Sequence, residues 1–147
     1  MRYNYKTYPD RRPHPAFPDD TSWIAVLEVR LSCPAKQTGP TARFEAVVDS
    51  GCVHTVFHSD IGRSIGIDVN SGIRGELGGL VQGPRAPAYY HDVALHVDAF
   101  IITIRAGFSD KLPAAGILGR KGFFEHFVVR FDPTLDPPGF EIERVGV

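Results

Sequence analysis

Long apolar runs and an excess of either charge are missing from this sequence of 147 residues. No apolar segment approaches the ~20 residues that a membrane-spanning helix needs. Sixteen Lys and Arg against 17 Asp and Glu leave a formal net charge of -1, which gives no general attraction to a nucleic-acid backbone. The first 20 residues also lack the apolar core of a secretory signal. We therefore predict a cytoplasmic protein with no nucleic acid and no membrane as a partner.

Cysteine is scarce as well, since Cys33 and Cys52 are too few for a disulfide framework. The candidate metal ligands are Cys52, His54 and His58. The two histidines would share a face on a helix, but the residues between them are typical of a strand. We interpret both as surface histidines and predict neither a metal nor another cofactor.

Fifteen Gly and 12 Pro favour short strands and turns over long helices. A short helix is predicted at 58–65, with Ser59 as its N-cap, and a helical turn near 122–127. Strands are indicated by β-branched and aromatic residues and by alternation. The predicted strands are 23–31, 42–48, 89–97, 100–105, 128–131 and 140–145, with a Gly-rich hairpin at 73–87. This pattern predicts an all-β fold, a small closed barrel with one or two short helices.

The N-terminal residues differ from the rest, because the first 20 contain four prolines and no Ile, Leu or Val. Such a segment cannot bury itself, so we expect residues 1–21 to be an extended Pro-rich arm or to dock on a domain at 22–147. Its tyrosines would then pack on that body or on a second subunit. Arg12-x-x-Pro15-x-x-Pro18 also matches some SH3 ligands, but a solvated arm is the favoured interpretation.

Asp49 ends an apolar strand and begins the tripeptide Asp49-Ser50-Gly51. A carboxylate on a rigid strand end is well mounted for acid–base chemistry, and glycine lets the backbone approach closely. The alternative is an ordinary turn in which the aspartate bonds its own backbone. The tripeptide alone favours the turn.

Three further segments change that balance. Thr55 follows Asp49 by six residues, the apolar pair Ile117-Leu118 precedes Gly119, and the Gly-rich stretch Gly75–Leu80 lies between them. In order and spacing the sequence resembles the retropepsin-like aspartic peptidases, the single-domain family that includes retroviral proteases. The closing segment Phe127–Asp132 is similar to that of bacterial members. The resemblance covers roughly residues 22–145.

The resemblance implies a hydrolase, an aspartic endopeptidase that cleaves extended peptides. Two carboxylates would share a proton around one water, and since the motif occurs once, the enzyme would be a homodimer with Asp49 from each subunit. Ser50 would brace the two active-site loops, and Gly51 would line the cleft. The substrate-binding residues would be Cys52, Val53, Ile117 and, in a flap that closes over the peptide, Gly78, Gly79 and Leu80.

Two residues depart from the family pattern. Val53 stands where many retroviral members have an acidic residue paired with the arginine that is Arg120 here, so that ion pair is absent. Cys52 replaces an alanine, and a thiol beside the carboxylates would make activity sensitive to oxidation. Pepsin-like relatives carry a hydroxyl at this place; because a thiol is a weaker donor, we expect a pH optimum nearer neutral.

Two other functions are compatible with parts of the sequence. Gly62-Arg63-Ser64-Ile65-Gly66 matches the nucleophile elbow of α/β-hydrolases, but it lacks the preceding strand and the helical crossovers. A non-catalytic dimeric module that binds peptides or acts as a scaffold would keep the fold without needing Asp49. Fold alone does not decide between that module and a peptidase.

Overall fold

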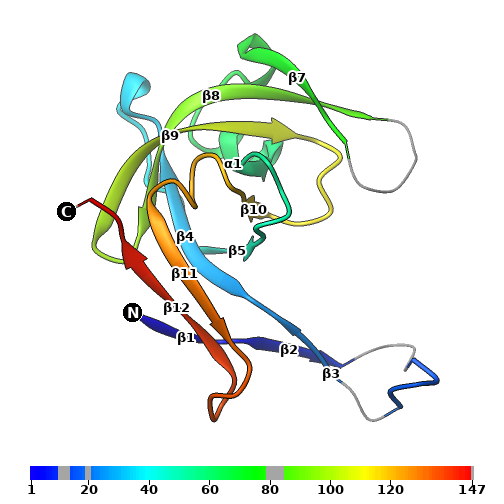
Figure 1. Ribbon diagram of the computed structural model, residues 1–147. Helices are drawn as coiled ribbons and strands as arrows, with labels where there is room; N and C mark the ends of the chain where they lie inside the picture. Colours follow the sequence, from blue (N-terminus) through cyan, green and yellow to red (C-terminus); the bar gives the residue numbers. More distant parts are fainter. Residues whose placement is uncertain (10–13, 19–20, 79–84, 147) are drawn as a thin grey trace.

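Six strands close into a barrel in the computed structural model, which describes residues 1–9, 14–18, 21–78 and 85–146 (Figure 1). Around the barrel the order is β4, β5, β10, β6, β9 and β8, and a further pairing of β4 with β8 completes the circle. The predicted all-β fold and closed barrel are confirmed. The barrel strands are β4 (Val26–Ser32), β5 (Phe44–Val48), β6 (Val56–His58), β8 (Ala86–Val97), β9 (Phe100–Ser109) and β10 (Gly116–Leu118).

A hairpin extends one wall of the barrel. Strand β7 (Ile73–Leu77) pairs antiparallel with the first part of β8, from Ile73 opposite Tyr90 to Leu77 opposite Ala86. The hairpin lies at the top of Figure 1 and corresponds to the predicted Gly-rich hairpin. Gly79, Leu80 and Gly83 lie outside the described residues.

A second sheet joins the two ends of the chain. Its order is β1 (Arg2–Asn4), β12 (Gly139–Arg144) and β11 (Phe127–Asp132), and a separate pair consists of β2 (Lys6–Pro9) and β3 (Thr21–Ile24). The rings of Tyr3 and Tyr5 stack on Phe140 with centroids 5.5 and 5.9 Å away. The first residues are thus docked by backbone pairing and by aromatic contacts, and β2 and β3 extend away from the barrel (Figure 1).

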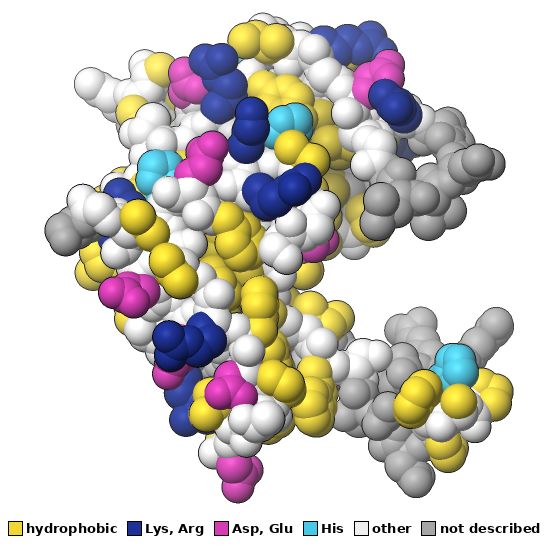
Figure 2. Space-filling model, viewed as in Figure 1, with side chains coloured by type: hydrophobic (Ala, Val, Ile, Leu, Met, Phe, Trp, Pro, Cys, Tyr) yellow, Lys and Arg dark blue, Asp and Glu magenta, His cyan; other side chains and the backbone are white. Residues whose placement is uncertain are grey.

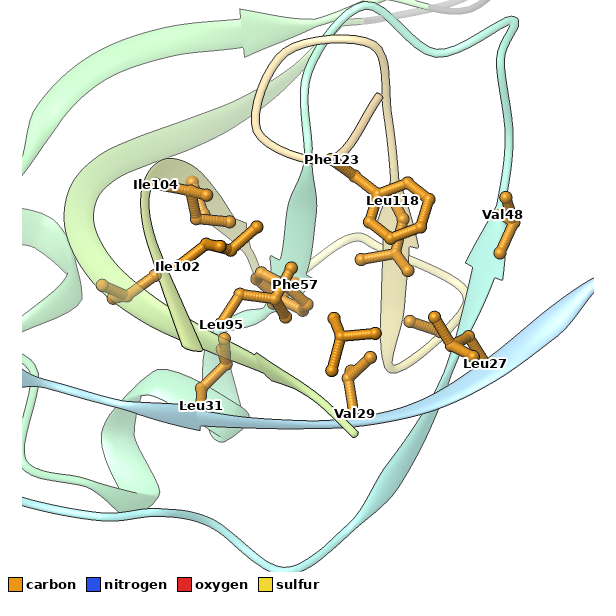
Figure 3. Packing of buried hydrophobic residues seen from close by; sticks show 14 of the residues in the cluster. Leu27, Val29, Leu31, Val48, Phe57, Leu95, Ile102, Ile104, Leu118 and Phe123 are labelled. Atoms are coloured by element: carbon orange, nitrogen blue, oxygen red, sulfur yellow. The ribbon is translucent and has the colours of Figure 1, made fainter. Parts of the chain in front are cut away.

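Alternating side chains of the barrel strands form the core (Figure 3). On β4, Leu27, Val29 and Leu31 point inward and are almost fully buried, whereas Glu28 between them is exposed. This is the period of two that a strand with one buried face requires. Fully buried aromatic residues fill the rest of the interior: Phe57, Phe108, Phe123, Phe127 and Phe140.

Several predicted boundaries were wrong. The strand expected at 23–31 is interrupted at Ala25, whose carbonyl instead accepts the Val48 N–H at 2.8 Å. The N-cap of the helix is His58 rather than Ser59, because His58 Nδ1 accepts the Asp60 N–H at 3.1 Å. Ser59 is buried instead. The helical elements of the described residues are α1 (Ser59–Ser64) and the 3-10 turns η1 (Pro34–Lys36) and η2 (Val69–Ser71).

The structure places the possible nucleophile elbow in helix α1. Ser64 lies at the end of the helix, and its hydroxyl donates to the Ile61 carbonyl at 2.6 Å. A Cβ at Gly62 would lie 2.9 Å from the Phe108 ring, so this glycine serves close packing. In the described ranges, no helix is long and apolar enough to cross a bilayer.

Candidate functional site

Strand β10 brings the two halves of the sequence motif together. It runs parallel to β5, with Ile117 opposite Val47 and Leu118 opposite Val48. The Asp49 N–H continues this pairing by donating to the Leu118 carbonyl at 3.0 Å. The segment that ends in Asp49 therefore lies beside Ile117-Leu118-Gly119, although the two are far apart in the sequence.

Backbone hydrogen bonds hold the loop after Asp49. The Arg120 N–H donates to the Cys52 carbonyl at 2.9 Å, and the Lys121 N–H donates to the Val53 carbonyl at 2.8 Å. Both donors belong to the segment that directly follows β10, the strand that supports Asp49. The loop after Asp49 is therefore fixed relative to β10.

Thr55 links the same two segments through its side chain. Its hydroxyl accepts the Gly119 N–H at 3.0 Å and donates to the Lys121 carbonyl at 2.9 Å. The side chain is fully buried, so both hydrogen bonds are made away from water, where an unpaired group would be costly. The hydroxyl six residues after Asp49 is thus part of the support of the site.

Gly119 is required by close approach. A Cβ there would lie 2.2 Å from the His54 carbonyl oxygen and 2.8 Å from that of Cys52. Both contacts are with backbone atoms, which cannot move aside as a flexible side chain would. Any larger residue would separate the two segments.

The Asp49 side chain is exposed at the end of β5. Its Oδ1 accepts the Gly51 N–H at 2.9 Å, and a Cβ on Gly51 would lie 3.1 Å from that oxygen. The ordinary turn considered from the sequence is therefore present. Within the described residues, the carboxylate makes no ion pair and Oδ2 has no hydrogen-bond partner, so one oxygen is held and the other faces solvent.

The Cys52 thiol is bonded to the backbone of its own loop. Its Sγ donates to the His54 carbonyl at 3.0 Å. Burial raises the pKa of Cys52; the nearby Asp49 carboxylate adds to this rise, whereas the bond to His54 and the charge of Arg120 oppose it. The thiol is therefore kept protonated.

The remaining predicted site residues lie in different places. Val53 is 46% exposed, and Ile117 is half-buried on β10. Ser50 is exposed, and its hydroxyl has no hydrogen-bond partner within the described part of the chain. Gly78 follows β7 on the separate hairpin. Gly79 and Leu80 are outside the described residues.

The sequence does not predict that His54 and Tyr90 meet beside the loop that follows Asp49. The Tyr90 hydroxyl lies 3.1 Å from His54 Nδ1, and the two rings meet edge to face with centroids 5.4 Å apart. Both line a pocket of about 350 Å³. From the sequence, His54 was interpreted as a surface histidine and Tyr90 only as part of a strand. No local signal links them, because the contact depends on how β8 packs beside the loop. The other residues that line this pocket are Thr103, Ile104, Arg105, Lys121, Gly122, Glu125 and His126.

The cluster considered for a metal has other roles. His58 caps α1, and Cys52 is bonded to the backbone. Over the described ranges, no group of three His, Cys, Asp or Glu side chains is placed to hold a metal ion.

No protein-family model matches this chain. No curated protein matches it. In solved structures, the chain is similar to the EIAV protease complexed with the inhibitor HBY-793, with a TM-score of 0.46 and 16% sequence identity. The alignment covers 66% of this chain and 82% of that one.

Proposed function

We propose that the chain is a retropepsin-like aspartic endopeptidase of bacterial type that works as a homodimer. The observation that carries the proposal is the pairing of β5 with β10, which mounts Asp49 beside Ile117-Leu118-Gly119. The Asp49 carboxylate is exposed to a substrate, and its backbone is held by the Leu118 carbonyl. A group fixed on a rigid strand end can be aimed at a reacting atom.

The reaction needs a second carboxylate. A lone aspartate accepts a proton only weakly, whereas two close carboxylates cannot both ionise and therefore share one proton. One would accept a proton from the attacking water while the other protonates the carbonyl oxygen of the scissile bond. Since the Asp-Ser-Gly motif occurs once in the sequence, the second carboxylate would be Asp49 of another copy.

The substrate would bind as an extended strand between the β7–β8 hairpin and a cleft floor formed by Asp49 and the loop that follows it. Cys52, Val53 and Ile117 would line the floor, and Gly78, Gly79 and Leu80 would belong to the flap. Ser50 would brace the two loops, and its exposed hydroxyl is available for that contact.

Digestion of a diverse peptide library from pH 4 to 8, read by mass spectrometry, tests the proposal. The wild type and Asp49→Asn are compared, since the amide keeps the size of the side chain but cannot ionise. We expect cleavage by the wild type alone, with a bell-shaped pH profile that belongs to the pair of carboxylates and an optimum nearer neutral than pepsin's.

Equal cleavage by both proteins would contradict the role of Asp49. Absence of cleavage by both, from protein shown to be a folded dimer, would favour the non-catalytic peptide-binding module. The hydrogen bond from the Gly51 N–H to Asp49 Oδ1 is the observation that favours this non-catalytic module, because an ordinary turn contains the same contact.

A further inference from the structure

The ring of Tyr90 occupies a slot made by two glycines. A Cβ on Gly75 of β7 would lie 2.8 Å from the Tyr90 ring, and a Cβ on Gly107 of β9 would lie 3.1 Å from it. In register, Tyr90 stands opposite Gly107 on one side and Ile73 on the other. The ring is therefore held against both neighbouring strands, and its position is fixed relative to the base of the β7–β8 hairpin.

From this slot the hydroxyl of Tyr90 reaches the loop that follows Asp49. It lies 3.1 Å from His54 Nδ1. The phenol donates this hydrogen bond when Nδ1 carries no proton, and accepts it in the tautomer that has the proton on Nδ1. Burial, reinforced by the nearby Cys52, raises the pKa of Tyr90, so the phenol keeps its proton at neutral pH.

His54 transmits this contact to the loop backbone. Its carbonyl accepts the Cys52 thiol at 3.0 Å and is packed closely against Gly119. Its ring is held by Tyr90 through the hydrogen bond and through the edge-to-face contact at 5.4 Å. A single side-chain hydrogen bond thus joins the base of the hairpin to the loop of Cys52 and Val53.

We propose that Tyr90 is a positioning residue that, through its hydrogen bond to His54, holds the loop of Cys52 and Val53 at a fixed distance from the base of the β7–β8 hairpin. This inference rests on the proposed function, in which the loop and the hairpin bind opposite sides of the peptide. Tyr90 itself touches no reacting atom. Its effect is on peptide binding, because it orders the loop before the substrate arrives.

The test is Tyr90→Phe, which keeps the ring in its slot and removes only the hydroxyl. Tyr89→Phe is the matched control, since the Tyr89 hydroxyl makes no hydrogen bond to any described residue. Amide hydrogen exchange is measured for Arg120 and Lys121, which donate to the loop carbonyls, and for β7. In Tyr90→Phe we expect these amides to exchange about five- to tenfold faster. We expect the melting temperature to stay within about 3 °C of the wild type.

Kinetics with a peptide that the wild type cleaves distinguish a positioning role of Tyr90 from a merely structural one. For Tyr90→Phe we expect KM to rise about three- to tenfold, as for the loss of one hydrogen bond, with kcat within about twofold. The single variant His54→Asn should keep the wild-type KM and the wild-type rates of amide exchange, because the asparagine amide places a polar atom near the position of Nδ1. His54→Leu has no such atom and should resemble Tyr90→Phe.

Wild-type exchange rates or a wild-type KM in Tyr90→Phe would overturn the positioning role. The same holds if Tyr89→Phe has an equal effect. Failure of the wild type to cleave any peptide would overturn the proposed function instead. The exchange comparison does not depend on activity and still decides whether Tyr90 orders the loop.

Discussion

At the scale of single residues, the chemistry beside Asp49 is set by where donors point. The Cys52 thiol donates its hydrogen bond to the His54 carbonyl rather than to the Asp49 carboxylate. A raised pKa also leaves less thiolate, and thiolate is the form that oxidants and alkylating agents attack. We therefore expect Cys52 to be less sensitive to oxidation than the sequence suggests.

We predict that Cys52 is alkylated slowly. Because burial raises the pKa of Cys52, its reaction with iodoacetamide at pH 7.5 should be at least about threefold slower than in the same protein unfolded in urea. The measurement is mass spectrometry of the peptide that contains Cys52 during a time course, repeated up to pH 9. Equal rates in folded and unfolded protein would show that the folded state does not suppress the thiolate.

The residues that carry the site differ in how visible they are in the sequence. Asp49, Gly51, Thr55 and Gly119 were found because they lie at fixed distances within short motifs. The contact of Tyr90 with His54 could not be found, because residues 36 positions apart meet only through strand packing. The hydrogen bond of Asp49 to its own turn was also expected, and it is compatible with both interpretations of the tripeptide.

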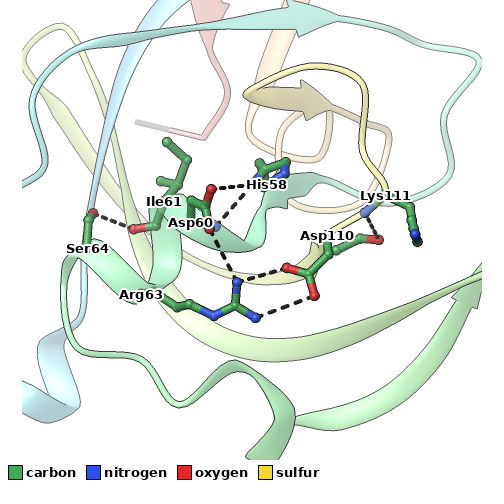
Figure 4. A network of polar contacts seen from close by, with 8 residues as sticks. His58, Asp60, Ile61, Arg63, Ser64, Asp110 and Lys111 are labelled. Carbon is green, nitrogen blue, oxygen red and sulfur yellow. Dashed lines mark hydrogen bonds and ion pairs between the residues drawn. The ribbon is translucent and has the colours of Figure 1, made fainter.

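At the scale of elements, helix α1 is anchored to the end of β9 by exposed charges (Figure 4). Arg63 NH1 lies 2.8 Å from Asp110 Oδ1 and 3.3 Å from Asp60 Oδ1. The hydrogen bond from Arg63 is the main cause that lowers the pKa of Asp110 below its usual 3.8. The pairs are solvent-exposed, so water and salt weaken them.

We predict a small and pH-dependent effect of Arg63→Met. At pH 7 the melting temperature should fall by no more than about 3 °C. A carboxyl whose pKa is lowered in the folded state stabilises the protein above its unfolded pKa, and this contribution is lost as the pH falls through the folded pKa. The difference from the wild type should therefore shrink below pH 3.8.

Arg74→Met is the control for this change, because Arg74 is exposed on β7 and makes no ion pair within the described ranges. Thermal unfolding of all three proteins is followed by circular dichroism at pH 7 and at pH 3. The difference at pH 7 should also shrink in about 1 M NaCl. A difference of equal size at both pH values would exclude the ion pair as its cause.

At the scale of the whole molecule, the sequence predicted an all-β closed barrel, but it did not predict which strands pair over long range. Alternation and turn residues indicated the strands and hence an all-β barrel. The pairing of β4 with β8 that closes the barrel is long-range, as is the pairing of β1 with β12. The composition of the first 20 residues predicts that they cannot bury themselves, but nothing in it selects β12 as the partner of β1.

The arrangement of the molecule leaves apolar surface beside the site. Figure 2 shows a hollow between the barrel and the strands β2 and β3, with hydrophobic side chains along it. Trp23 on β3 shares the alternation of the buried Leu27 but lies beyond the barrel, where it is 51% exposed. Phe131, at the far end of β11, is 42% exposed. The proposed dimer would place a second copy near this face, because each chain supplies one Asp49.

Mixing experiments test whether two chains share one active site. If each site needs Asp49 from both subunits, a heterodimer of wild type with Asp49→Asn is inactive. An equal mixture, after subunits have exchanged, should then retain about a quarter of the activity of the same total amount of wild type, since about a quarter of the dimers contain two wild-type chains. The Asp49→Asn chain is uniformly 15N-labelled, so that native mass spectrometry can separate heterodimers from both homodimers and show that they have formed. An equal mixture with Tyr89→Phe serves as the control that keeps full activity. Retention of half the activity with Asp49→Asn would mean that each chain works alone, and a second carboxylate would then have to come from the same chain.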